Sequence, residues 1–150
     1  MTAALRILIS LLVLAAAPAL AQDKEKDEAA ELLAAVVQVK AKILPNARSL
    51  ATLGPQRQGS GVLVRDGYVL TIGYLVIEAE AIEVIALDGK AVPATLAAYD
   101  HASGFGLLKL IGPFSAKPLP LGDSTALEER EPTMVASHGG REGVNLVYVV

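Results

Sequence analysis

Short apolar runs separated by turn signals dominate the chain after its first 35 residues. Residues 36–43 alternate apolar and polar side chains, which is the pattern of a half-buried strand. Two later pairs of runs each flank an Asp-Gly dipeptide, which favours a tight hairpin turn. The expected strands cover residues 36–43, 61–64, 68–71, 82–87, 91–98, 106–111, 134–137 and 144–150. Short strands at this spacing predict an all-β sandwich or barrel.

The N-terminus has a different pattern. Residues 1–21 contain one charged residue, Arg6, followed by an almost unbroken apolar run over residues 7–17 and then by Ala19-Leu20-Ala21. A cation, an apolar stretch and small residues before a cleavage point are typical of a secretory signal peptide. The apolar run is shorter than the roughly 20 residues that a membrane-spanning helix needs. We therefore expect cleavage after Ala21 and export of the rest of the chain.

The segment between the signal peptide and the first strand favours a helix. Residues 22–35 are rich in Ala, Leu, Glu and Lys, which are good helix formers, and Asp23 can cap a helix N-terminus. We expect a short helix or a solvated leader here.

Composition excludes several classes of function. The chain has 150 residues, enough for one domain. Its formal charge of −3 becomes −4 once Arg6 is removed with the signal peptide. No basic stripe is present to contact phosphates, so we expect no nucleic-acid partner, and no membrane association after signal cleavage.

With two His and no Cys, we expect no metal site and no cofactor. A Cys-free exported domain is better suited to a bacterial periplasm than to a disulfide-rich extracellular setting.

Five short motifs follow one another in a recognisable order. They are Gln58-Gly59-Ser60-Gly61, Asp66-Gly67-Tyr68-Val69-Leu70-Thr71, Asp88-Gly89-Lys90, Leu107-Leu108-Lys109-Leu110 and Pro118-Leu119-Pro120-Leu121-Gly122-Asp123-Ser124. In this order and spacing they resemble trypsin-like serine proteases, especially the Cys-free bacterial Deg/HtrA-like branch. The resemblance covers about residues 36–150. It implies a trypsin-like first barrel over residues 36–115, followed by the inter-barrel connector and a partial second barrel over residues 116–150.

The resemblance also locates the positions where a catalytic triad would lie. Serine proteolysis needs a hydroxyl nucleophile, an imidazole that takes its proton and a carboxylate that orients the imidazole. The family's His position falls on Tyr74 and its Asp position on Gly104. The family's G-x-S-G-G segment, which carries the nucleophile, is not found in the sequence. A phenol with a pKa near 10 is a poor general base, and glycine has no carboxylate.

We therefore assign no catalytic residue and expect an inactive pseudoprotease that binds a peptide or protein. Two alternatives remain open. The chain is a member of a serine-type endopeptidase family that is active only in a longer or reorganised form, or it is a non-functional truncated product. The ligand and the oligomeric state are not predicted.

Other polar residues allow a functional and a structural interpretation. Asp100, His101 and Ser103 are possible groove residues, but their spacing favours a plain turn. The ring of Tyr74 either fills the space of the missing imidazole or lines a binding groove. The acidic cluster formed by Glu78, Glu80 and Glu83 is expected to be a solvated face rather than a cation site.

Two glycine-containing motifs resemble catalytic ones only in part. Gly122-Asp123-Ser124 lacks the two glycines that would follow a protease nucleophile, so we expect a linker turn. His138-Gly139-Gly140 resembles the oxyanion-hole loop of lipases, but no G-x-S-x-G motif accompanies it. We expect a glycine-rich turn with an exposed His138.

Overall fold

A computed structural model describes residues 27–149, and the predicted signal peptide lies outside the described residues. A short helix covers residues 27–34, inside the segment where the composition predicts one. No helix within residues 27–149 is both long enough and apolar enough to cross a membrane.

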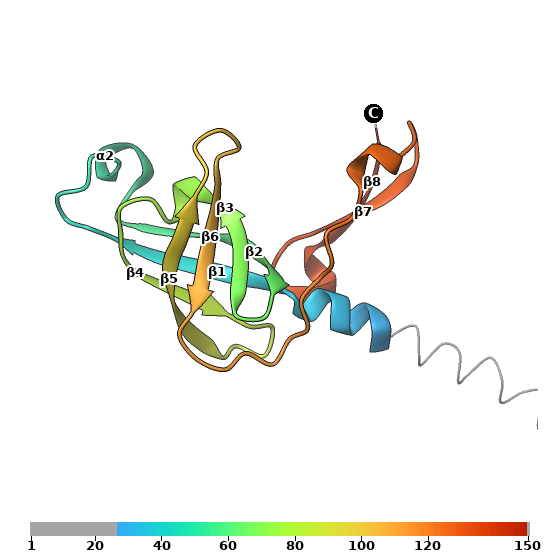
Figure 1. The fold of residues 1–150 in the computed structure, drawn as a ribbon, viewed down its shortest axis with the longest axis horizontal. Helices are drawn as coiled ribbons and strands as arrows, with labels where there is room; N and C mark the ends of the chain where they lie inside the picture. The colour runs from blue at the N-terminus through green and yellow to red at the C-terminus, as the bar shows by residue number, and fades with distance from the viewer. Residues whose placement is uncertain (1–26, 150) are drawn as a thin grey trace, which may run out of the picture. The chain divides into compact units, whose positions relative to one another are not determined.

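Six antiparallel strands form a closed barrel in the order β1-β2-β3-β6-β5-β4 (Figure 1). The strands are β1 (Val36–Ile43), β2 (Gln56–Arg65), β3 (Tyr68–Ile72), β4 (Ala79–Ile85), β5 (Ala91–Tyr99) and β6 (Phe105–Leu110). The barrel confirms the predicted all-β, trypsin-like fold class. Closure means that each of these strands has a hydrogen-bonded neighbour on both sides, so the barrel has no free edge.

The alternation of side chains explains how these strands fill one core. In β1 the side chains of Val37, Val39, Ala41 and Ile43 are all buried, whereas Lys40 between them is exposed. The strand turns at Gly67 and Gly89 have positive φ values of 71° and 86°, which suits the Asp-Gly hairpins predicted from the sequence. The largest fully buried side chains belong to Leu63, Leu75, Leu108, Val37, Val39, Val69, Val76 and Val84.

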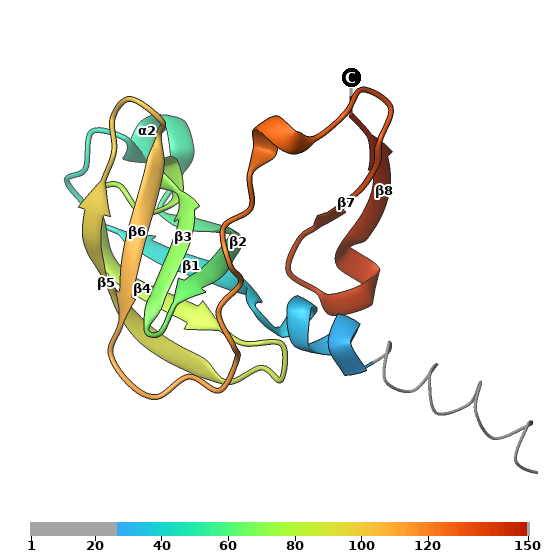
Figure 2. The same cartoon turned by 45° about the vertical axis from the view of Figure 1, so that its right-hand side comes forward.

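The last two strands form a separate sheet. β7 (Pro132–Ala136) pairs antiparallel with β8 (Val144–Tyr148), and the two strands make a two-stranded hairpin (Figure 2). The remaining elements are short: α2 (Leu50–Leu53) and the 3₁₀ helices η1 (Gly73–Leu75), η2 (Ser124–Ala126) and η3 (Gly140–Gly143). Sequence patterns predicted both strands but none of these four short helices, because three or four residues carry too little periodicity.

Candidate functional site

Tyr74 lies on η1, immediately after β3. Its neighbours Gly73 and Leu75 are buried, whereas Tyr74 is 49% exposed. The backbone N–H of Gly73 donates a hydrogen bond of 2.7 Å to the carbonyl oxygen of Gly104. The segments that carry Tyr74 and Gly104 are therefore neighbours in space, as the positions of a triad His and Asp would have to be.

The backbone at this junction leaves no room for a side chain on Gly73. A Cβ atom at Gly73 would collide with the Tyr99 ring and with the carbonyl oxygen of Gly104. Gly104 itself has a φ of 75°, a left-handed conformation that favours glycine. Gly104 therefore lies in a tight turn that presents a carbonyl group and no carboxylate.

The turn that leads into Gly104 is held together by Asp100. Its carboxylate accepts hydrogen bonds from the backbone N–H groups of Ala102 (3.0 Å) and Ser103 (3.2 Å) and from the Ser103 hydroxyl (2.5 Å). The Ser103 hydroxyl is the main cause that lowers the pKa of Asp100. The His101 ring instead lies against the Tyr99 ring, with centroids 4.6 Å apart. Asp100, His101 and Ser103 thus share one exposed turn, but the carboxylate bonds to the turn and not to the imidazole.

Three exposed apolar side chains gather beside this turn. Ile72 pairs directly with Phe105 across β3 and β6, and Tyr74 follows Ile72 by two residues. Ile72 and Phe105 are 47% and 48% exposed, close to the value for Tyr74. We call Ile72, Tyr74 and Phe105 the Tyr74 patch. It presents two aromatic rings and an aliphatic side chain to solvent near the Gly73–Gly104 hydrogen bond.

Arg57 fixes the backbone beneath the patch. It points inward from β2 and is only 6% exposed. Its guanidinium donates to the carbonyl oxygens of Tyr74 (2.6 Å) and Ile77 (3.3 Å) and to the Ser49 hydroxyl (2.6 Å), and its Nε has no partner within residues 27–149. The sequence analysis missed Arg57. Arg57 lies in the part of β2 that precedes the strand predicted over residues 61–64.

The acidic cluster does not converge on one point. Glu78, with a φ of 58°, accepts hydrogen bonds from the Ser49 hydroxyl (2.6 Å) and from the backbone N–H groups of Ser49 (2.9 Å) and Arg48 (3.1 Å), which together lower its pKa. Glu80 forms an ion pair of 2.8 Å with Lys42. Within residues 27–149 no cluster of His, Asp and Glu side chains could hold a metal ion.

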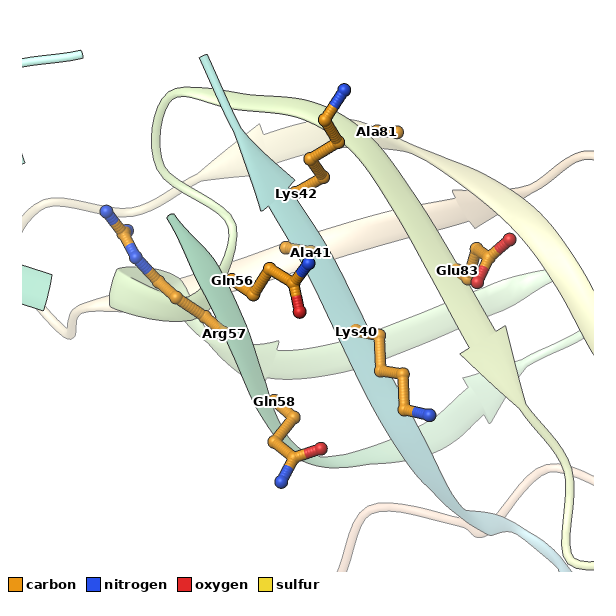
Figure 3. A pocket seen from close by; sticks show the side chains of 8 residues that line it. All are labelled: Lys40, Ala41, Lys42, Gln56, Arg57, Gln58, Ala81 and Glu83. Carbon is orange, nitrogen blue, oxygen red and sulfur yellow. The ribbon is translucent and has the colours of Figure 1, made fainter. Parts of the chain in front are cut away.

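A shallow groove of about 590 Å³ runs over the outer face of β1. Figure 3 shows Lys40 and Lys42 on β1 flanked by Gln56 and Gln58 of β2 and by Glu83 of β4, while Arg57 leaves β2 on the opposite side. The groove carries both positive and negative charges.

His138 makes long-range contacts that the sequence did not predict. Its backbone N–H donates to the Ser60 hydroxyl (3.1 Å), its ring Nδ1 lies 3.1 Å from the same hydroxyl, and its Nε2 lies 3.3 Å from the Gln38 amide nitrogen. The expectation of an exposed His138 is wrong, because the ring is partly buried against β1 and β2. The partners are 78 and 100 residues away in the chain, so no local pattern could indicate them.

Asp123 also has a structural role. Its carboxylate accepts hydrogen bonds from the backbone N–H (2.9 Å) and the hydroxyl (2.7 Å) of Thr125 and so caps η2. The side-chain hydrogen bond from Thr125 is the main cause that lowers the pKa of Asp123. The Gly122-Asp123-Ser124 motif lies at the start of a single 3₁₀ turn.

A closed six-stranded antiparallel barrel, with η1 after its third strand and a tight turn before its sixth, defines the class of trypsin-like β-barrels. The chain matches the family model of the trypsin-like peptidase domain over residues 59–147, more than half of its length, and it belongs to that family. A comparison with curated proteins finds no match.

Proposed function

We propose that this trypsin-like domain is exported, that it does not cleave peptide bonds as its sequence stands, and that it binds a peptide or protein. One observation carries the proposal. Next to the Gly73–Gly104 hydrogen bond, where the family resemblance puts the triad His and Asp, the chain has an exposed phenol and a glycine.

The chemistry of these two residues opposes hydrolysis. A phenol is a poor general base at neutral pH, so Tyr74 cannot take a proton from a serine hydroxyl efficiently. Gly104 offers no carboxylate to orient a base or to stabilise an imidazolium ion. Loss of a catalytic triad lowers the rate of a serine protease by about a million-fold.

The Tyr74 patch supports a binding role. Aromatic side chains are enriched at protein interfaces because they bury a large area at a low entropy cost. The Arg57 hydrogen bond to the Tyr74 carbonyl oxygen fixes the backbone of the patch. The patch therefore loses little conformational freedom when a ligand binds. We expect the ligand to be an extended peptide that places an apolar side chain against Tyr74 and Phe105.

Covalent labelling tests the absence of catalysis. The purified protein is treated with a fluorophosphonate probe and with an unfolded protein substrate such as casein. We expect neither a labelled serine nor cleavage products. A labelled serine together with cleavage would instead support the alternative that this family member is an active serine peptidase.

Peptide selection tests the binding site. A phage-displayed library of short random peptides is selected on the wild-type protein, and the recovered peptides are measured against two variants. Tyr74→Ala should weaken binding at least about tenfold, as expected for an aromatic residue at the centre of an interface. Tyr68→Ala, at the other end of β3, should leave binding unchanged. If no peptide is recovered, or if Tyr74→Ala binds as tightly as the wild type, the patch is not the binding site.

Export is tested by the intact mass of the protein recovered from a periplasmic extract. Cleavage after Ala21 should remove the mass of residues 1–21. An uncleaved N-terminus would contradict the signal-peptide prediction.

A further inference from the structure

The loop between β1 and β2 is compact and closed at its base. The Ile43 N–H donates to the Pro55 carbonyl oxygen (2.9 Å), so residues 44–54 leave the barrel and return to it at one point. Ala47 and Leu50 of this loop pack against the barrel core. A compact surface loop whose ends meet is an Ω-loop, a type that frequently has a functional role. We call residues 44–54 the Ω-loop.

Glu78 holds the Ω-loop in place. Its carboxylate accepts hydrogen bonds from the backbone N–H groups of Arg48 and Ser49 and from the Ser49 hydroxyl. Its carbonyl oxygen accepts a further hydrogen bond from the Leu44 N–H (3.0 Å). The φ of 58° at Glu78 is uncommon for a residue with a side chain, and such conformations persist where the surroundings enforce them, often at functional sites. The Ω-loop thus fixes the backbone just after η1.

The Ser49 hydroxyl also joins the Ω-loop to Arg57. It donates to the Glu78 carboxylate (2.6 Å) and accepts from Nη2 of Arg57 (2.6 Å), so one oxygen atom lies between a carboxylate and a guanidinium group. Nη1 of Arg57 donates in turn to the Tyr74 carbonyl oxygen (2.6 Å). A continuous chain of hydrogen bonds therefore runs from Glu78 through Ser49 and Arg57 to the backbone of Tyr74.

The Nη2 group of Arg57 depends on Ser49. Arg57 is only 6% exposed, and its Nε bonds to no residue in the part of the chain that the structure describes. A buried charged donor that loses its acceptor carries a large free-energy penalty. Without the Ser49 hydroxyl, the guanidinium can regain a protein acceptor for Nη2 only by moving. Such a move shifts or breaks its hydrogen bond to the Tyr74 carbonyl oxygen.

We propose that Ser49 is a positioning residue for ligand binding at the Tyr74 patch, and that the Ω-loop sets the position of Tyr74 through Arg57. This inference rests on the proposed binding function of the patch. Ser49 needs no contact with the ligand, because it acts by keeping the Arg57 guanidinium on the Tyr74 carbonyl oxygen. Hydrogen bonds in a chain polarise one another in the protein interior, so a change at Ser49 reaches the patch through a single side chain.

Peptide binding by variants of Ser49 tests the proposal. The probes are the peptides selected from the phage-displayed library on the wild-type protein, and each Kd is measured well below the melting temperature. Ser49→Ala removes the bridging hydroxyl and should raise the Kd about tenfold, as expected for the loss of a hydrogen bond to a buried charge. Ser49→Thr keeps a hydroxyl at this position and should have the Kd of the wild type.

Thr125→Ala is the matched control. Like Ser49→Ala, it removes a hydroxyl that donates to a carboxylate, here the 2.7 Å hydrogen bond to Asp123. Thr125 lies on η2 and has no part in the hydrogen bonds of the Ω-loop. The Kd of this variant should equal that of the wild type. Far-UV circular dichroism verifies that every variant is folded.

Hydrogen exchange of the free protein gives a second readout that needs no ligand. The N–H groups of Val76 and Ile77 both donate to the Gly73 carbonyl oxygen at 3.0 Å, so their exchange reports on the order of η1. In Ser49→Ala these two amides should exchange about five to ten times faster than in the wild type, because the Arg57 support of η1 is weakened. In Ser49→Thr and Thr125→Ala they should keep the wild-type rate.

The outcomes separate this proposal from the binding function on which it rests. Peptides that Tyr74→Ala weakens and Ser49→Ala does not would leave the binding site intact and overturn only the role of Ser49. The same conclusion follows if Ser49→Thr binds as weakly as Ser49→Ala, or if Ser49→Ala leaves the exchange of Val76 and Ile77 unchanged. Recovery of no peptide would instead overturn the binding function itself, and with it any positioning role in binding.

Discussion

The barrel and the β7–β8 hairpin are built from similar apolar strands but differ in what surrounds them. In the barrel, each strand has two neighbours, and inward side chains such as Val39 and Leu108 are fully buried. In the hairpin, each strand has one neighbour, and Met134 and Leu146 remain largely exposed. A two-stranded hairpin is at best marginally stable by itself in water. Apolar strands therefore form a buried core in one region and leave apolar side chains exposed to solvent in the other.

The largest expected effect comes from truncating equivalent leucines in the two regions. Leu108→Ala removes a fully buried side chain from the barrel and should lower the free energy of unfolding by about 3 kcal/mol. Leu146→Ala removes an exposed side chain and should change the free energy of unfolding by less than about 0.5 kcal/mol. Urea unfolding followed by far-UV circular dichroism measures both values. Equal losses for the two variants would show that the Leu146 side chain is packed as tightly as that of Leu108.

A smaller, local effect is expected at the contact between the two regions. His138→Ala removes the ring that lies against Ser60 and Gln38. Backbone amides of β7 and β8 should then exchange with deuterium about five to ten times faster, while the amides of the barrel strands keep their protection. Hydrogen exchange measured by mass spectrometry resolves the two regions.

His101→Ala provides the control for this comparison. It removes the other histidine of the chain, whose ring contacts Tyr99 and not the hairpin. Hairpin exchange should stay at the wild-type rate in this variant. If His138→Ala also left the rate unchanged, the hairpin would be held by something other than His138.

The contrast between the two regions also explains how much the sequence could predict. The bounds of β1 agree with the predicted residues 36–43, because inward and outward positions alternate there from Val37 to Ile43. The two Asp-Gly turns located the hairpins β2–β3 and β4–β5, since such turns need little beyond local sequence. The barrel was predictable because local patterns and overall topology agree.

The contacts that form the candidate site were predicted only in part. The family resemblance indicated Tyr74 and Gly104, and the structure places their segments side by side. Arg57 was missed, because a charged residue in a strand is expected to face solvent unless its buried partners are known. The contact between His138 and Ser60 joins residues 78 positions apart. Such long-range polar contacts depend on the folded geometry and leave no periodic signal.

Acid should produce the smallest effect, and the hairpin strands contribute no charged group to it. The Glu78 carboxylate ties the segment that contains Ser49 to the end of η1, and the hydrogen bond from the Ser49 hydroxyl is the main cause that holds its pKa below the ordinary value of 4.5. A carboxyl group with a lowered pKa in the folded state stabilises the fold above its unfolded pKa. That stabilisation is lost as the pH falls below 4.5 and through the lowered value.

Glu78→Gln should therefore make the protein less stable near neutral pH and reduce the loss of stability between neutral pH and the acid range. Glu83→Gln removes the same charge from nearby β4 without touching Ser49, and it should keep the acid dependence of the wild type. Thermal unfolding between pH 3 and pH 7 measures the dependence for each variant. Because Glu78 is only partly buried, we expect a modest shift of the melting temperature. If Glu78→Gln and Glu83→Gln gave the same acid dependence, the Glu78–Ser49 hydrogen bonds would not contribute to the stability of the barrel.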